Sequence, residues 1–245
     1  MKTDNRVSGD EIAEESSVAR GGDRLRPQIF ISVFLGLLIL TVFVLPSLGA
    51  GVVYERWYGN IVFSALAVVG VAIAWDHPRL LRVAIPVGVA GTFARWFAFF
   101  HPDRSSQFLS EGASLAIILM ISWILLVQIF GRAKSITKVS IQAAIAIYLL
   151  FGFGWANAYQ IAIQVNPHAF QSTVELSSTS VEEWFYYSFV TLTTLGYGDI
   201  TPLSRVARSL AIGEALTGQL YLAVLIARLI GLEMLSHQVE KKSET

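Results

Sequence analysis

The chain has 245 residues, of which 54% are hydrophobic and 15% are charged, and its mean hydropathy is +0.57. A soluble domain of this size usually carries about 25% charged residues; low charge alone would suggest a large core, so the distribution of the apolar residues decides whether the chain is a membrane protein. The formal net charge of zero favours neither nucleic acid nor an acidic surface as a partner. The absence of cysteine excludes disulfides, thiolate metal sites and a cysteine nucleophile.

Residues 1–26 are polar and of mixed charge, and we expect a disordered cytoplasmic tail there. A gating or partner-binding segment is the alternative. No cleavable signal peptide is expected, because the first apolar run begins late and is long enough to span.

Six apolar runs follow, each near the ~20 residues that a helix needs to cross a hydrocarbon core of ~30 Å. They cover residues 27–45, 59–75, 80–100, 109–130, 139–165 and 203–235. A seventh run, 184–195, is too short to span and lies between the last two. The pattern predicts an all-α membrane protein with six transmembrane helices and one re-entrant half-span.

These runs divide the chain into parts. We expect a four-helix transmembrane domain at 27–131, a cytoplasmic linker at 132–138, a pore domain at 139–235 and a cytoplasmic tail at 236–245. Lys and Arg gather before the first run, between the second and third, between the fourth and fifth, and after the last. The bias places both termini in the cytoplasm and the half-span at the outer side. Arg82 and Arg95, near the ends of the third run, are expected to snorkel to an interface.

The half-span predicts a pore or a site, since irregular backbone at membrane depth is tolerated only inside protein or beside a water-filled cavity. Ser180 and Glu183 have the spacing of a capping box, and a helix is expected over 181–193. Its carboxyl end would point its negative dipole into the membrane, where it favours a cation. Acidic residues of this segment would concentrate cations at the outer mouth, although capping and solvation explain part of the pattern: Glu175, Glu182, Glu183 and Asp199.

Directly after this helix the sequence reads TLTTLGYGD, residues 191–199. A strand that turns successive carbonyls toward one axis needs alternating left- and right-handed conformations, and glycine enters the left-handed region cheaply. Gly196 and Gly198 meet that need. Four such strands around an axis would present carbonyl rings from residues 194–197, with the Thr194 hydroxyl below them.

This run resembles the signature of the potassium channel family, and the resemblance covers roughly residues 139–235. It implies a homotetramer of six-helix, one-pore-loop subunits, with three identical partners in the membrane lipid. K⁺ would be the permeant ion, without an organic cofactor. The implied selectivity-filter residues are Thr194, Leu195, Gly196, Tyr197 and Gly198. Leu195 stands where many relatives have Val or Ile.

The resemblance also implies filter support from Thr191 and Thr193, and from a Tyr187 hydrogen bond to Asp199, because many relatives carry a tryptophan pair where this chain has Tyr186 and Tyr187. Pro202 is expected to cap the inner helix.

Two further inner-helix residues are singled out. Glu214 is an ionisable residue inside a span, and we favour structural support behind the filter over a position in the cavity. Gly218 falls at the hinge position for gating, with close helix packing as the alternative.

The fourth run carries no Lys or Arg, so steep voltage gating through it is not expected. No catalytic motif is present, and we expect no enzyme activity. The alternatives are a non-conducting sensor or regulatory subunit, a weakly selective cation channel, and a potassium transporter subunit, which usually needs four pore repeats in one chain. The gating stimulus and any regulatory partner stay open, no nucleic acid partner is expected, and the compact size resembles channels of the prokaryotic inner membrane.

Overall fold

The computed structural model describes residues 28–44, 52–75, 77–132, 137–173 and 181–243. The expected tail at 1–26, most of the linker at 132–138, Glu175 and the capping residue Ser180 lie outside the described residues.

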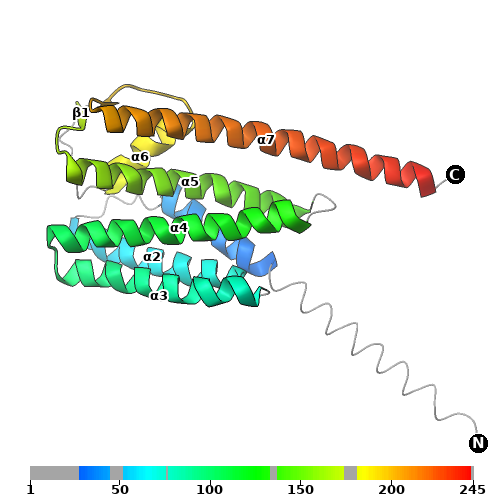
Figure 1. Ribbon diagram of the computed structural model, residues 1–245, viewed down its shortest axis with the longest axis horizontal. Helices are drawn as coiled ribbons and strands as arrows, with labels where there is room; N and C mark the ends of the chain where they lie inside the picture. Colours follow the sequence, from blue (N-terminus) through cyan, green and yellow to red (C-terminus); the bar gives the residue numbers. More distant parts are fainter. Residues whose placement is uncertain (1–27, 45–51, 76, 133–136, 174–180, 244–245) are drawn as a thin grey trace, which may run out of the picture.

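Helices dominate the described chain (Figure 1). Residues 28–39 form a helix that continues as the π-helical turn η1, Leu40–Val44. The later helices are α2 (Val52–Ile73), α3 (Pro78–Phe100), α4 (Arg104–Arg132), α5 (Lys138–Val165), α6 (Val181–Leu192) and α7 (Arg205–Ser243). Two short strands, β1 (Phe170–Ser172) and β2 (Ile200–Pro202), form an antiparallel pair in which Gln171 faces Thr201.

Four of these helices are long and apolar enough to cross a membrane: Pro78–Phe100, Arg104–Val127, Lys138–Val165 and Arg205–Met234. Two shorter apolar helices, Gln28–Phe43 and Gly59–Ile73, correspond to the first two predicted spans. The described chain is therefore mostly helical, with four candidate membrane spans, and the count of six spans stays a prediction.

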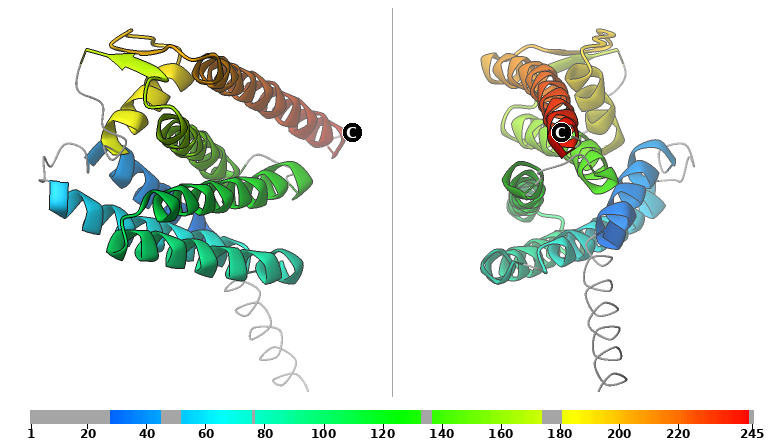
Figure 2. Two further views of the ribbon diagram at one scale, coloured as in Figure 1. Left: turned by 60° about the vertical axis from the view of Figure 1, so that its left-hand side comes forward. Right: turned by 90° about the vertical axis from the view of Figure 1, so that its right-hand side faces the viewer.

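The helices pack largely in chain order. α3 packs on α4 and α4 on α5, and the short α6 is wedged between α5 and α7 (Figures 1 and 2). One core cluster joins the helix at 28–39 to α2, α3, α4 and the first half of α5. A second cluster joins the end of α5 to β1, α6, β2 and the start of α7. This second cluster positions the segment that follows α6.

The residues at the amino ends of several helices explain where those helices begin. Pro78 occupies the first turn of α3, where its missing N–H leaves no hydrogen bond unmade. Thr137 caps α5 by accepting a 3.2 Å hydrogen bond from the Ser140 N–H. The predicted cap of the inner helix is wrong: Pro202 ends β2, and the Ser204 hydroxyl accepts a 3.1 Å hydrogen bond from the Ala207 N–H.

The structure adds detail to two further segments. The polar tail expected after residue 235 continues α7 as helix to Ser243, because its Gln, Glu and Lys residues are good helix formers that extend an existing helix at little cost. The segment that follows α5 contains β1. A three-residue strand has too little alternation to be recognised in a sequence, and it is defined here by its partner β2.

Candidate functional site

The short helix α6 begins the site. It has 12 residues, or about 18 Å at ~1.5 Å per residue, well under the ~30 Å of a hydrocarbon core. Glu182 and Glu183 occupy its first turn, where the helix dipole favours negative charge. Its bounds agree with the predicted helix to within one residue. Trp184, Tyr187, Ser188 and Leu192 are buried along α6, so its position is fixed by packing.

The backbone after α6 alternates in handedness. Three residues two positions apart have positive φ: Thr194 at 61°, Gly196 at 60° and Gly198 at 79°. The predicted left-handed conformation of both glycines is confirmed. Thr194 extends the alternation by one step, and sequence reasoning missed it because a threonine in this region costs about 1–2 kcal/mol. Such alternation turns successive carbonyls to the same side of the chain.

Hydrogen bonds tie this segment to the last turn of α6. The Thr194 N–H donates to the Thr191 carbonyl at 3.0 Å, and the Leu195 N–H donates to the Val190 carbonyl at 2.9 Å. The Thr193 hydroxyl donates to the Phe189 carbonyl at 2.6 Å. This bond holds the Thr193 side chain against the end of α6, and its supporting role for a filter stays a prediction.

Residues 193–198 are exposed in the single chain. Leu195 is 59% exposed and Tyr197 is 67% exposed. A Cβ built on Gly196 or Gly198 would meet no atom within 4 Å. Only backbone conformation therefore calls for glycine at these two positions within one chain. One side of the segment is free for contacts outside the subunit.

The predicted hydrogen bond from Tyr187 to Asp199 is wrong. The donor is Tyr186, whose hydroxyl lies 2.5 Å from Asp199 Oδ2. Tyr186 also stacks on Tyr197, with ring centroids 6.4 Å apart and planes 7° from parallel. The error is one residue of helical register, which turns a side chain by about 100°.

This bond sets the ionisation of both partners. Donation from Tyr186 holds the pKa of the Asp199 carboxyl below its ordinary value. The same bond raises the pKa of Tyr186 to about 12. Asp199 also accepts a 2.9 Å hydrogen bond from the N–H of Ile200. The carboxylate is thus ionised and held at the end of the segment near neutral pH.

Tyr187 points to a different side of α6 from Tyr186 and is buried. Its ring contacts Tyr159 edge-on, with centroids 4.8 Å apart, and lies 5.5 Å from the ring of Phe170. Its hydroxyl is hydrogen-bonded to the Thr191 side chain. Tyr187 therefore anchors α6 to α5 and β1 and does not contact Asp199, while Thr191 contacts Tyr187 from within the same helix.

Glu214 is fully buried behind α6. Its carboxyl group lies between the Ser188 hydroxyl of α6 and the Tyr159 hydroxyl of α5, each at 2.5 Å. Glu214 therefore contacts α5 and α6 in the described chain, and its role in supporting a filter stays a prediction. Sequence reasoning missed Ser188 and Tyr159, since nothing in their spacing marks them as partners of a residue on α7.

Gly218 lies against the end of α6. A Cβ built on it would stand 2.3 Å from the Leu192 carbonyl oxygen, so only glycine allows α7 this close. α7 runs without a break through this position. The close-packing alternative therefore has a specific contact, and the hinge stays a prediction. One residue further on, Gln219 reaches the segment itself, since its Nε2 lies 3.4 Å from the Thr194 hydroxyl.

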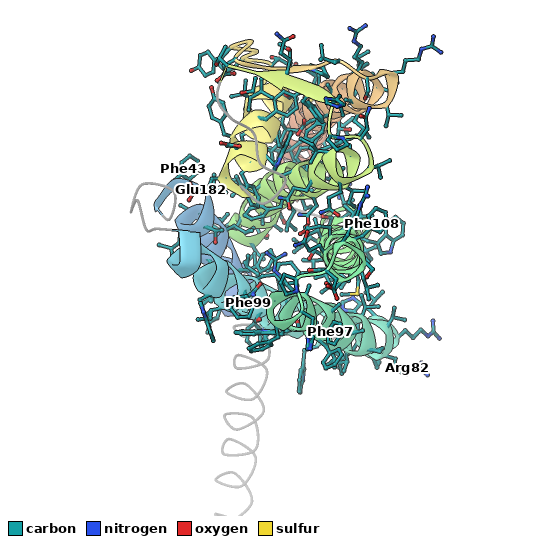
Figure 3. The ribbon with its side chains drawn as sticks, turned by 90° about the vertical axis from the view of Figure 1, so that its left-hand side faces the viewer. Phe43, Arg82, Phe97, Phe99, Phe108 and Glu182 are labelled. Atoms are coloured by element: carbon teal, nitrogen blue, oxygen red, sulfur yellow. The ribbon has the colours of Figure 1, made fainter. Side chains whose placement is uncertain are left out.

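The two arginines of α3 differ from each other. Arg82 is exposed and points away from the helices (Figure 3), and its snorkelling to an interface stays a prediction. Arg95 does not snorkel to an interface. It donates to Asn60 Oδ1 at 3.0 Å and to the Ser114 hydroxyl at 3.1 Å, and its guanidinium lies 4.6 Å from the centroid of the Phe63 ring.

This arginine belongs to a polar cluster that reaches the second half of the chain. Glu111 on α4 interacts electrostatically with Arg95. With its amide oriented to suit its neighbours, Gln160 on α5 donates to Glu111 at 3.3 Å. A mostly apolar cavity of about 90 Å³ lies beside the cluster, lined also by Asn157 and Phe185. Polar contacts thus link the four-helix part of the chain to α5.

Comparison with known proteins agrees with this geometry. A family model described as "Ion channel" matches residues 143–233, from α5 through α6 to α7. Together with the apolar helices, the match indicates a multi-pass membrane protein.

Two curated relatives align with part of the chain. Protein LctB of Bacillus caldotenax is 39% identical over 88 residues, covering 34% of this chain and 64% of the relative. Protein LctB of Geobacillus stearothermophilus is 33% identical over 81 residues, covering 31% of this chain and 60% of the relative. The chain thus spans less than two thirds of the length of either relative. No solved structure matches.

Proposed function

We propose that the chain is one subunit of a potassium-selective channel, in which four copies surround a shared pore and conduct K⁺ passively. The observation that carries the proposal is the backbone of residues 194–198, left-handed at every second position. Carbonyl rings from Thr194, Leu195, Gly196 and Tyr197 would replace the hydration shell of the ion. The Thr194 hydroxyl would form the innermost ring.

Electrostatics support a cation as the permeant ion. The carboxyl end of α6 lies next to this segment, and a helix dipole is negative there. Asp199 adds an ionised carboxylate at the other end, and the segment between Lys138 and Arg205 contains no Lys or Arg. Repeated four times around an axis, these charges would attract cations and repel anions.

The surface of α7 supports an assembly of several copies. Of its most apolar 18-residue stretch, 6% is buried in the single chain, whereas 28–50% of the corresponding stretches of α3, α4 and α5 is buried. The filter segment is exposed beside it. Three further subunits and lipid would cover these apolar faces. A homotetramer also supplies the four strands that closed carbonyl rings need.

We propose that the first four helices do not act as a steep voltage sensor. Between Arg104 and Arg132, α4 contains no basic residue. Arg95 on α3 is held by Asn60 and Ser114 instead of standing in a repeating ladder. We propose that both termini are cytoplasmic and that the protein resides in a prokaryotic inner membrane, gated by a stimulus or partner acting through the membrane domain.

The test is ion flux through the purified protein in liposomes. We expect K⁺ flux that exceeds Na⁺ flux by orders of magnitude and is blocked by Ba²⁺. Gly196→Ala is the filter variant, and Gly231→Ala on α7 is its control, because a Cβ at Gly231 meets no atom within 4 Å. Equal K⁺ and Na⁺ flux would favour a weakly selective cation channel. An absence of flux in all variants would favour a non-conducting subunit.

A further inference from the structure

Glu214 is the only Asp, Glu, Lys, Arg or His that is fully buried among the residues whose side-chain burial the structure describes. It lies on α7, within the candidate membrane-spanning segment Arg205–Met234. A buried carboxylate loses several kcal/mol of solvation unless a cation or several donors compensate. The protonation state of this group therefore follows from its neighbours.

The hydrogens available for the hydrogen bonds around Glu214 can be counted one by one. The Ser188 hydroxyl oxygen lies 2.5 Å from Glu214 Oε1 and 2.8 Å from the Gly152 carbonyl oxygen. Ser188 has one hydroxyl hydrogen for these two contacts, and a carbonyl can only accept. If Ser188 donates to Gly152, the hydrogen between Ser188 and Glu214 must come from the carboxyl group.

The second carboxyl oxygen of Glu214 accounts for the last hydrogen of the group. Glu214 Oε2 accepts the hydroxyl hydrogen of Tyr159 at 2.5 Å. The protonated acid thus uses every hydrogen in the chain from Tyr159 through Glu214 and Ser188 to Gly152. An ionised carboxylate would take the Ser188 hydrogen and leave the lone pairs of Ser188 and Gly152 facing each other at 2.8 Å.

The other groups around Glu214 do not compensate a negative charge. The titratable side chains that face it are Tyr159 and Tyr148 from α5 and Tyr187 from α6. On α7 itself and on the packed elements, no Lys, Arg or His of the described chain contributes to its electrostatics. Ionisation would therefore place an unpaired charge in an apolar setting.

We infer that Glu214 is a neutral, protonated carboxylic acid that positions α6 from behind by donating to Ser188 and accepting from Tyr159. It joins α5, α6 and α7 through one side chain. The link to conduction rests on the proposed function, because α6 carries the filter segment. Alkaline pH that ionises Glu214 breaks the donation to Ser188, loosens α6 and lowers K⁺ flux.

The protonation state is tested by infrared spectroscopy of the full-length protein in liposomes at neutral pH. The difference spectrum between wild type and Glu214→Gln is expected to contain the carbonyl band of a protonated carboxyl group. Glu233→Gln, at an exposed position on the same helix, is the control and should leave that protonated-carboxyl band in place. A wild-type minus Glu214→Gln spectrum with carboxylate bands alone would overturn the inference.

Function and stability are measured with the same variants. Glutamine supplies an N–H donor for Ser188 and a carbonyl for Tyr159, so Glu214→Gln should keep its thermal stability and any K⁺ flux at alkaline pH where the wild type loses both. Parallel pH profiles would overturn the switch. If no variant conducts, the proposed function fails, while the infrared and stability results still decide the protonation of Glu214.

Discussion

Replacing Gly218 with alanine separates close packing from a hinge. The added Cβ would stand 2.3 Å from the Leu192 carbonyl oxygen, and an ordinary contact of 3.4 Å exceeds this by 1.1 Å. The obstacle is backbone at the end of α6, which cannot rotate away as a side-chain tip can. α6 and α7 must therefore move apart by about an ångström in every subunit, and the filter segment moves with them.

The expected change in the free energy of unfolding of Gly218→Ala follows from two opposing contributions. Overpacking of this kind costs roughly 1–3 kcal/mol, whereas Gly→Ala inside a helix gains about 1 kcal/mol from backbone propensity. Gly231→Ala on the same helix has the gain without the clash, because no atom lies within 4 Å of its Cβ. The two variants should therefore differ in free energy of unfolding by roughly 1–3 kcal/mol per subunit, with Gly218→Ala the less stable.

The assay is equilibrium unfolding of the purified protein in mixed detergent micelles, paired with K⁺ flux in liposomes. Close packing predicts that Gly218→Ala loses stability and flux together. A hinge predicts altered flux with the stability of the Gly231→Ala control. Equal unfolding free energies in the two variants would refute the packing argument for Gly218.

Three other perturbations test separate parts of the site. Gly196→Ala should abolish potassium selectivity or conduction, because a left-handed φ costs a residue with a Cβ about 1–2 kcal/mol in each subunit; an unchanged potassium current would contradict the filter assignment. Tyr186→Phe should return the lowered pKa of Asp199 toward its ordinary range. Because the wild-type carboxylate loses its stabilising charge only as pH falls through that lowered value, the acid loss of flux should move to higher pH in Tyr186→Phe and stay in place in Tyr187→Phe. Arg95→Gln should destabilise the protein by roughly 1.5–3 kcal/mol for each of the two hydrogen bonds to the charged group that is lost, whereas the exposed Arg82→Gln should change the unfolding free energy by less than about 0.5 kcal/mol.

The parts of the fold that the sequence predicts best are those with a local cause. α5 and α6 begin and end within one residue of the predicted bounds, because apolar length and helix-end chemistry act over a few neighbouring residues. The left-handed glycines were predictable for the same reason, since only glycine enters that region cheaply. These features depend on the residue itself and need no knowledge of the tertiary structure.

The features that the sequence missed depend on distant partners. Arg95 was expected at an interface, but its actual partners Asn60 and Ser114 come from two other helices. The choice between Tyr186 and Tyr187 as donor to Asp199 depends on the rotation of α6 about its axis. That rotation is set by the burial of Trp184 and Tyr187 against the second core cluster. A single sequence reports periodicity, and not the absolute rotation of a short helix.

Thr194 shows why the filter segment needs this distant support. Its left-handed backbone is unfavourable for a residue with a Cβ, so the surrounding structure must hold it there. Its own N–H is bonded to Thr191, and the next residue is bonded to Val190, both in the last turn of α6. The strained conformation is therefore only as stable as the placement of α6. Since that placement depends on the contacts of Glu214 and Gly218 from α7, inner-helix substitutions far from the carbonyls should act on conduction through Thr194 first.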